Sequence, residues 1–429
     1  MNETGGQINV DTDLTIAGGT TFTNDAGGNV DLIGGAFTMT LDGATAAFTN
    51  DGTVTWPAGN DGNKGIAGAG TFVNNGTFNH AYGGDNDNLV LSNSVTFENN
   101  GTFDIQDRGD LQSNNGSTVT FENNGLFLKS VAGTDPSFVF SFDFDSGTFA
   151  QSATGTVESN AGRLRIAAGN VTSDPAGTWT ANGGDIEVAS TWTGTVTGSA
   201  AGTNHILITD SSNGLVESDF AVGAGGVTFA ISGNGLRWGE QDIDSTSGNL
   251  TNIGRLTVVY DKEKTLSGGG ELITGNGGVT TVNDTVTAND SSTMRVAGGG
   301  LLQGDSNFTG AVSVDSGGTV DPGGGGTGIR DAGAMTIAVG GNFDDGGNTT
   351  AAGSGHDQLS VTGTAGISDS TLNLTGSLVA VPGDMATILT ATGVLTGEFA
   401  GFPNGETFSF NAQPVEIIYT ANDAILEYD

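Results

Sequence analysis

The sequence contains no cysteine and has few prolines, tryptophans and basic residues. Its 429 residues include 7 prolines, 4 tryptophans, 4 tyrosines and 11 lysines or arginines. Without cysteine the chain has no disulfides, zinc–thiolate sites, iron–sulfur clusters or cysteine nucleophiles. The scarcity of proline and the 35% hydrophobic content argue against a proline-rich disordered chain. No apolar run of about 18 residues occurs, so we expect no membrane-spanning helix.

Acidic residues dominate the charge. Aspartate and glutamate number 48, and the formal net charge is −37. Such a charge repels phosphate backbones and anionic lipid headgroups. We therefore expect no nucleic-acid partner and no membrane insertion, and cations are the natural counter-charge.

One short motif, Thr-Phe-x-Asn or a close variant, recurs through the first part of the chain. Its phenylalanines are 26, 24, 25 and 24 residues apart. They are Phe22, Phe48, Phe72, Phe97 and Phe121, and each is followed two residues later by an asparagine, at Asn24, Asn50, Asn74, Asn99 and Asn123. Six residues after the last three lie Phe78, Phe103 and Phe127. A period of this length is typical of proteins whose repeats stack on one another.

Each repeat predicts a strand, a turn and a second strand. Apolar and polar residues alternate on both sides of Asn-Asn-Gly, whose residues tolerate a left-handed backbone. Glycine, with 75 copies, and β-branched residues are too dense for helices. We therefore predict an all-β, right-handed parallel β-helix with coils of about 24 residues. The phenylalanines would stack inside it, and the asparagines would form a ladder of hydrogen-bonded amides.

The regularity of the repeats changes along the chain, and we expect three regions in one continuous solenoid. Residues 1–130 hold the regular repeats, and residues 131–316 form irregular coils with longer loops. Residues 317–429 form the C-terminal end of the β-helix, after a glycine-rich segment that interrupts the strands.

The last quarter of the chain contains a characteristic order of short segments. They are Gly318-Thr-Val-Asp-Pro322-Gly, Met335-Thr-Ile-Ala-Val-Gly-Gly-Asn-Phe343, His356-Asp357-Gln358-Leu359-Ser-Val361, Ser370-Thr-Leu372-Asn-Leu374, Pro382-Gly383-Asp384-Met385 and Gly397-Glu-Phe399. This order resembles the C-terminal β-helix end of autotransporter and haemagglutinin-like passenger domains. The resemblance implies a secreted β-helix with an extracellular location on a bacterial cell surface.

Calcium is the one cofactor that the sequence suggests, because hard oxygen ligands are abundant. Gly83 to Leu91 loosely resembles the glycine-aspartate nonapeptide of calcium β-rolls, which makes Asp85, Asp87 and Asn88 candidate ligands. Calcium β-rolls repeat that nonapeptide in tandem, whereas it occurs once here. A solvated turn rich in aspartate and asparagine is the alternative.

Catalysis has little support in the sequence. The three histidines, His80, His205 and His356, are far apart, and no Ser-His-Asp set can be assembled from the spacing. His356 precedes Asp357, and we expect this pair to make turn hydrogen bonds. We predict no enzymatic activity.

The main alternative is a β-helix polysaccharide lyase, or a protein that binds or hydrolyses glycans. Such enzymes need basic or paired acidic groups in a groove, together with aromatic platforms. Arg237, Arg255, Lys262 and Lys264 are the basic residues to consider. We expect instead that the segment Asp261-Lys-Glu-Lys264 neutralises itself in surface ion pairs.

We therefore predict a non-catalytic extracellular bacterial surface protein, acting as an adhesin or as a self-assembling filament or surface-layer subunit. A rigid solenoid would bind its partners through many weak contacts. The expected partners are further copies, associated end to end, or glycans and proteins of a host or cell surface.

Overall fold

The computed structural model describes most of the chain as strands and turns. It is described here at all positions except 58–61, 82–87, 107–109, 115, 132–138, 189–190, 202–203, 209–219, 234, 240–241, 260–263, 325 and 378–379, and except the side chains of 139–146, 223–225 and 233. None of the described residues lies in a helix. Accordingly, this part of the chain has no helix that could cross a membrane. The predicted parallel β-solenoid with coils of about 24 residues is confirmed.

The chain divides into two compact units. The first unit comprises Met1–Gly223 and Ile231–Gly235, and the second comprises Ala224–Ala230 and Leu236–Asp429. The three regions that the repeat pattern suggests stay a prediction about regularity along the sequence.

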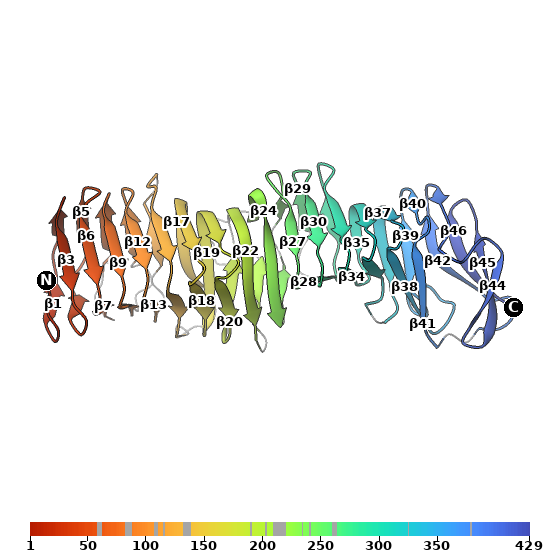
Figure 1. Ribbon diagram of the computed structural model, residues 1–429, viewed down its shortest axis with the longest axis horizontal. Helices are drawn as coiled ribbons and strands as arrows, with labels where there is room; N and C mark the ends of the chain where they lie inside the picture. Colours follow the sequence, from red (N-terminus) through yellow and green to blue (C-terminus); the bar gives the residue numbers. More distant parts are fainter. Residues whose placement is uncertain are drawn as a thin grey trace. The chain divides into compact units, whose positions relative to one another are not determined.

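Three columns of parallel strands build the first unit, and Figure 1 shows their successive coils side by side. One column contains β1 (Gln7–Val10), β4 (Asn29–Leu32), β7 (Thr53–Trp56), β10 (Thr77–His80), β13 (Thr102–Ile105), β16 (Leu126–Lys129), β18 (Thr156–Ser159), β20 (Thr178–Ala181) and part of β22 (Thr191–Ala200). The second contains β2 (Leu14–Ala17), β5 (Phe37–Asp42), β8 (Lys64–Gly68), β11 (Leu89–Ser92), β14 (Leu111–Ser113), parts of β17 (Val139–Gln151) and β19 (Gly162–Ser173), β21 (Gly184–Val188) and β23 (Ile206–Ile208). The third contains β3 (Thr21–Asn24), β6 (Ala47–Asn50), β9 (Thr71–Asn74), β12 (Thr96–Asn99), β15 (Thr120–Asn123) and the remaining parts of β17, β19 and β22.

The second unit also has three parallel columns. One contains part of β24 (Phe220–Gly233), β27 (Leu250–Asn252), β30 (Glu271–Thr274), β33 (Thr293–Val296), parts of β35 (Asn307–Val314) and β37 (Ile329–Ile337), β40 (Ala365–Gly366) and β43 (Leu395–Thr396). The second contains β25 (Leu236–Trp238), β28 (Arg255–Val258), β31 (Val279–Val282), β34 (Leu301–Gln303), β36 (Thr319–Asp321), β38 (Asn342–Gly347) and β41 (Thr371–Gly376). The third contains β26 (Ile243–Asp244), β29 (Lys264–Ser267), β32 (Val286–Ala288), the remaining parts of β35 and β37, β39 (Gln358–Val361) and β42 (Met385–Ala391).

The chain ends in an antiparallel arrangement. β46 (Asp423–Tyr428) pairs with β42 on one side and with β45 (Gln413–Tyr419) on the other, and β45 pairs with β44 (Glu406–Phe410). β46 therefore covers the edge that β42 would otherwise offer to another strand.

Strand alternation places the core inside both units. Successive side chains of a strand point to opposite faces of a sheet, and most strands of the regular repeats alternate between half-buried and buried positions. Phe48, Phe97 and Phe121 have no exposed surface. The side chains at every second strand position therefore fill the interior.

The glycine of each Asn-Asn-Gly turn is required for close packing between coils. A Cβ atom at Gly76 or Gly101 would lie 2.0 Å from the carbonyl oxygen of the equivalent glycine in the preceding coil, and one at Gly125 would lie 2.1 Å from it. None of these three glycines has a positive φ. The expectation that they supply a left-handed backbone is therefore wrong, because the constraint is the distance between stacked turns.

Candidate functional site

Two columns of phenylalanine rings fill the regular coils of the first unit. Along the first column, from Phe22 through Phe48, Phe72 and Phe97 to Phe121, neighbouring ring centroids are 4.7–5.1 Å apart and nearly parallel. Phe78, Phe103 and Phe127 form the second column, with distances of 4.9 and 5.4 Å. The two columns meet edge to face, as between Phe97 and Phe103 at 5.5 Å. Both arrangements stabilise aromatic pairs, so these rings hold the coils together.

An inner amide ladder runs beside the first ring column. It consists of Asn2, Asn24, Asn50, Asn74, Asn99, Asn123 and Gln151. Each asparagine Nδ2 donates to the side-chain oxygen of the next member at 2.7–2.8 Å. Asn74 Nδ2 also donates to the Thr102 carbonyl oxygen at 2.9 Å, so both amide hydrogens are used. The ladder stabilises the corner of the coil without burying a charge.

A second row of amides lies at the exposed corner of the same turns. Asn75 Nδ2 donates to Asp51 Oδ1 at 2.8 Å, Asn100 Nδ2 to Asn75 Oδ1 at 3.0 Å, and Asn124 Nδ2 to Asn100 Oδ1 at 3.0 Å. We call Asp51, Asn75, Asn100 and Asn124 the outer amide row. Sequence reasoning gave these residues only a turn role, although the doubled asparagine of each repeat is a visible signal. The row repeats one polar group per coil on the surface.

The candidate calcium ligands are only partly within the described structure. Asp85 and Asp87 lie outside the described residues, and Asn88 precedes β11. The Asn88 side-chain oxygen accepts a hydrogen bond from the Asp110 backbone N–H at 3.1 Å. Within the described part of the chain, no three acidic or histidine side chains gather closely enough to hold a metal ion. The calcium interpretation therefore stays a prediction.

Almost half of the basic residues are buried. Lys64, Lys129, Arg165, Lys264 and Arg330 have at most 2% of their surface exposed. Lys264 Nζ lies 2.8 Å from Asp284 Oδ2 and its side chain has no exposed surface, so the expectation that it lies at the surface is wrong. Its strand places it at an inward position, which the alternation of β29 determines. Lys262 lies outside the described residues.

The groups expected for a polysaccharide lyase do not form an aromatic platform. Arg237 is half-buried in β25, and Arg255 is exposed at the start of β28. Trp238 beside Arg237 has no exposed surface, and the other three tryptophans are equally buried. Sugar-binding platforms need an accessible ring face, which tryptophan does not provide in this fold.

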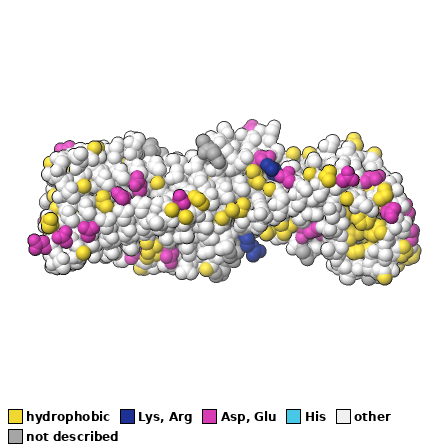
Figure 2. All heavy atoms as spheres, in the orientation of Figure 1, with side chains coloured by type: hydrophobic (Ala, Val, Ile, Leu, Met, Phe, Trp, Pro, Cys, Tyr) yellow, Lys and Arg dark blue, Asp and Glu magenta, His cyan; other side chains and the backbone are white. Residues whose placement is uncertain are grey.

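The burial of cations leaves a strongly anionic surface. Among the described acidic residues, only Glu187, Asp345 and Asp357 are buried. Figure 2 shows acidic side chains distributed over the face in view, with few basic ones among them. Among the described residues, the ratio of acidic to basic side chains is therefore higher on the surface than in the interior.

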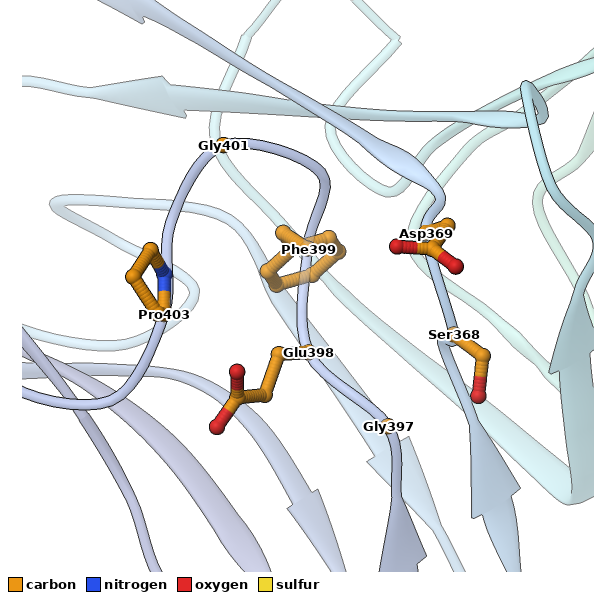
Figure 3. A pocket seen from close by; sticks show the side chains of 7 residues that line it. All are labelled: Ser368, Asp369, Gly397, Glu398, Phe399, Gly401 and Pro403. Carbon is orange, nitrogen blue, oxygen red and sulfur yellow. The ribbon is translucent and has the colours of Figure 1, made fainter.

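A surface pocket of about 590 Å³ lies near the C-terminus, lined by Ser368, Asp369, Gly397, Glu398, Phe399, Gly401 and Pro403. Asp369 and Glu398 are exposed. In Figure 3 the Glu398 side chain extends away from Asp369. Phe399 is buried, and its ring stacks on Phe343 at 6.0 Å, so it belongs to the core. Two exposed carboxyl groups that do not face each other lack the arrangement of a paired acid and base.

The second unit contains two buried carboxyl groups close to each other. Asp357 is 1% exposed, and its Oδ1 and Oδ2 accept hydrogen bonds from the backbone N–H groups of Gly328 and Gly346, each at 2.7 Å. The two donors lie 29 and 11 residues away in the sequence, so these are tertiary hydrogen bonds and not the expected turn bonds. Burial raises the pKa of Asp357 to about 6 and, together with the charge of Asp357, raises the pKa of Asp345 to about 8. The alternation of β38 after Phe343 places Asp345 inside.

Comparison with known proteins adds no family. The chain matches no protein-family model, and no curated protein matches it significantly. The arrangement of its own residues therefore carries the functional argument.

Proposed function

We propose that this chain is a non-catalytic structural protein of the bacterial cell surface, exported and displayed as a β-solenoid. Its lateral faces would act as an adhesive surface or as the contact between subunits of a filament or surface layer. The autotransporter-like order of segments in the last quarter supports the location. The observation that carries the proposal is the outer amide row, which places an exposed or half-exposed side-chain hydrogen-bonding group in each of four coils, a carboxylate in one and an amide in three.

Repetition makes weak contacts effective. One exposed amide contributes little to binding, but groups on successive coils of a rigid support can engage a repetitive partner together. Glycans and the lateral faces of other copies both offer repeated polar groups. The anionic surface would keep copies apart until divalent cations bridge them.

Association through the chain ends stays a prediction. β46 covers the edge of β42, so a stacked copy would have to pair with the strand edges of other columns. We therefore favour lateral association through the outer faces.

Binding can be tested with the purified chain and a variant in which Asn75, Asn100 and Asn124 are replaced by alanine. A matched control also carries three alanine substitutions, at exposed or half-exposed threonines of the second unit: Thr251, Thr281 and Thr336. We expect binding to a glycan array or to bacterial cells to fall in the first variant and to persist in the control. Equal binding by both variants would contradict the role of the row, and release of unsaturated sugars would contradict the non-catalytic assignment.

Electron microscopy with and without millimolar calcium tests self-association. We expect dispersed particles in the chelated sample and lateral clusters in the calcium sample. Uniform monomers at high concentration under both conditions would contradict the subunit role.

A further inference from the structure

Residues 347–356 leave the second unit as an excursion that returns to its starting point. An antiparallel bridge joins Gly347 to His356, and the Asp357 backbone N–H donates to the Gly346 carbonyl oxygen at 2.9 Å. Residues 348–349 and 351–352 are exposed, whereas Gly355 and His356 are buried. The excursion is therefore held at its base and projects into solvent beyond it.

The Asp357 carboxyl group ties this base to a neighbouring loop. Its two oxygens accept from Gly328 and Gly346, which lie 18 residues apart in the sequence. A Cβ atom at Gly323 would lie 2.4 Å from Asp357 Oδ1, so the glycine-rich loop packs directly against the carboxyl group. Asp357 thus joins Gly323 and Gly328, β38 and the excursion.

Asp345 lies beneath this connection and faces the interior. It is 4% exposed, and its Oδ1 accepts no hydrogen bond from any described residue. Tyr428 of the final strand is 1% exposed, and its hydroxyl likewise has no hydrogen-bond partner among the described residues. Burial and the neighbouring charge of Asp357 favour the protonated form of Asp345, and they outweigh a hydrogen bond from the Asp357 backbone that favours the ionised form.

Among the described residues, the titratable groups that act on the two carboxyl groups are all acidic. Asp345 is influenced by Asp357 and itself raises the pKa of Tyr428. Asp357 is further influenced by the acidic groups of Asp321 and Asp344. His356, whose Nε2 lies 3.0 Å from the Thr387 carbonyl oxygen, is the one histidine at the base.

We infer that Asp345 and Asp357 form a proton-controlled clasp. While Asp345 is protonated, the hydrogen bonds that Asp357 accepts hold residues 347–356 and the final strand against the solenoid. Ionisation of Asp345 places a second buried negative charge beside Asp357 and releases them.

The sign of the effect follows from the direction of the pKa shifts. The folded-state pKa values, about 8 for Asp345 and about 6 for Asp357, lie above the ordinary value of 3.8. Stability from the closed clasp is fully present below pH 4 or so and declines as the pH rises through 6 and 8. Above pH 8 or so Asp345 is ionised in the closed state as well, so it no longer stabilises that state.

Hydrogen exchange of the full chain, normalised for the intrinsic rate at each pH, tests the clasp. We expect protection of residues 353–357 and of β46 to fall roughly tenfold per pH unit between pH 6 and pH 8, the slope for loss of one proton. Protection of β30 and β33 in the same molecule serves as the internal reference. Constant protection of the clasp across this range in the wild-type chain would overturn the proposal without any variant.

Two substitutions separate the clasp from a general effect of pH. Asp345→Asn keeps the shape of the protonated side chain but cannot ionise, so protection should become flat between pH 6.5 and 8. Asp344→Asn removes a charge from the same strand at an outward position and should keep the wild-type slope. A wild-type slope in Asp345→Asn, or a flat profile in Asp344→Asn, would overturn the assignment to Asp345.

Discussion

The buried polar groups of the regular coils and of the C-terminal coils differ in kind. Between Asn24 and Asn123 the buried asparagines form a neutral column in which each amide donates to the next. In the second unit, Arg330 and Asp345 are buried, and Arg330 Nε and Asp345 Oδ1 have no hydrogen-bond partner among the described residues. A repeat therefore satisfies polar groups coil by coil, whereas unique coils depend on protonation or on distant partners.

We expect the largest loss of stability when one ring is removed from the first phenylalanine column. Phe97 is completely buried and stacks on Phe72 at 4.7 Å and on Phe121 at 5.0 Å. Replacing it by alanine leaves a cavity that neighbouring coils cannot fill, and we expect a loss of about 3–5 kcal/mol. Hydrogen exchange of β9, β12 and β15 in increasing denaturant measures this local stability. Phe22→Ala, at a half-buried ring, should cost less, and an equal cost would contradict the role of stacking.

The inner amide ladder can be broken at one member. Asn99→Ala leaves Asn74 Nδ2 and Asn123 Oδ1 without their side-chain partner in a buried site. We expect a loss of about 2 kcal/mol in the same exchange measurement, because unpaired buried polar groups keep their desolvation cost. Asn100→Ala is the matched control one residue away on the outer amide row, where the loss should stay below about 0.5 kcal/mol. If both variants lost the same stability, burial would not explain the ladder.

The two units should respond to pH in opposite directions. Burial lowers the pKa of His80 in the first unit to about 3, so the fold favours the neutral imidazole. Stability near His80 is present above pH 6.5 or so and declines as the pH falls toward 3, whereas stability at Asp345 declines as the pH rises toward 8. Each slope should be about 1.4 kcal/mol per pH unit at most. Exchange of β10 in wild type and His80→Leu, which should abolish the acid slope, checks the first half of the comparison.

A surface ion pair of the second unit should contribute least. Arg295 Nε lies 2.8 Å from Asp315 Oδ2, with 42% and 38% of the two side chains exposed. Solvent screens such a pair, so Arg295→Gln should cost less than about 1 kcal/mol, and the difference should shrink in high salt. Thermal unfolding at two salt concentrations measures it. A salt-independent loss of several kcal/mol would show that this pair behaves like a buried one.

Much of the fold was predictable because repetition reveals which residues share a column. The spacing between Phe72, Phe97 and Phe121 equals one coil, and the register pairs these residues directly. Period-2 alternation then assigns each side chain to the interior or the surface. The role of Gly101 was misjudged because one sequence gives the residue type but not the distance to the preceding coil.

The buried charges were harder to predict because their partners come from distant segments. Lys264 meets Asp284 of the following coil, although acidic residues lie closer to it in the sequence. Asp345 is influenced by the charge of Asp357, and its own charge raises the pKa of Tyr428 in the last strand. Neither contact repeats, so no period marks it in the sequence.

By itself the sequence determined the length of the coil, the inward and outward positions of the regular strands and the acidic character of the surface. These properties depend on local alternation and on identical residues recurring at one spacing. Only the tertiary structure decided that the second asparagine of each turn forms an outer amide row and that Asp345 interacts with Asp357. Both depend on the distance between segments that are far apart in the chain, and that distance is set by how the coils pack.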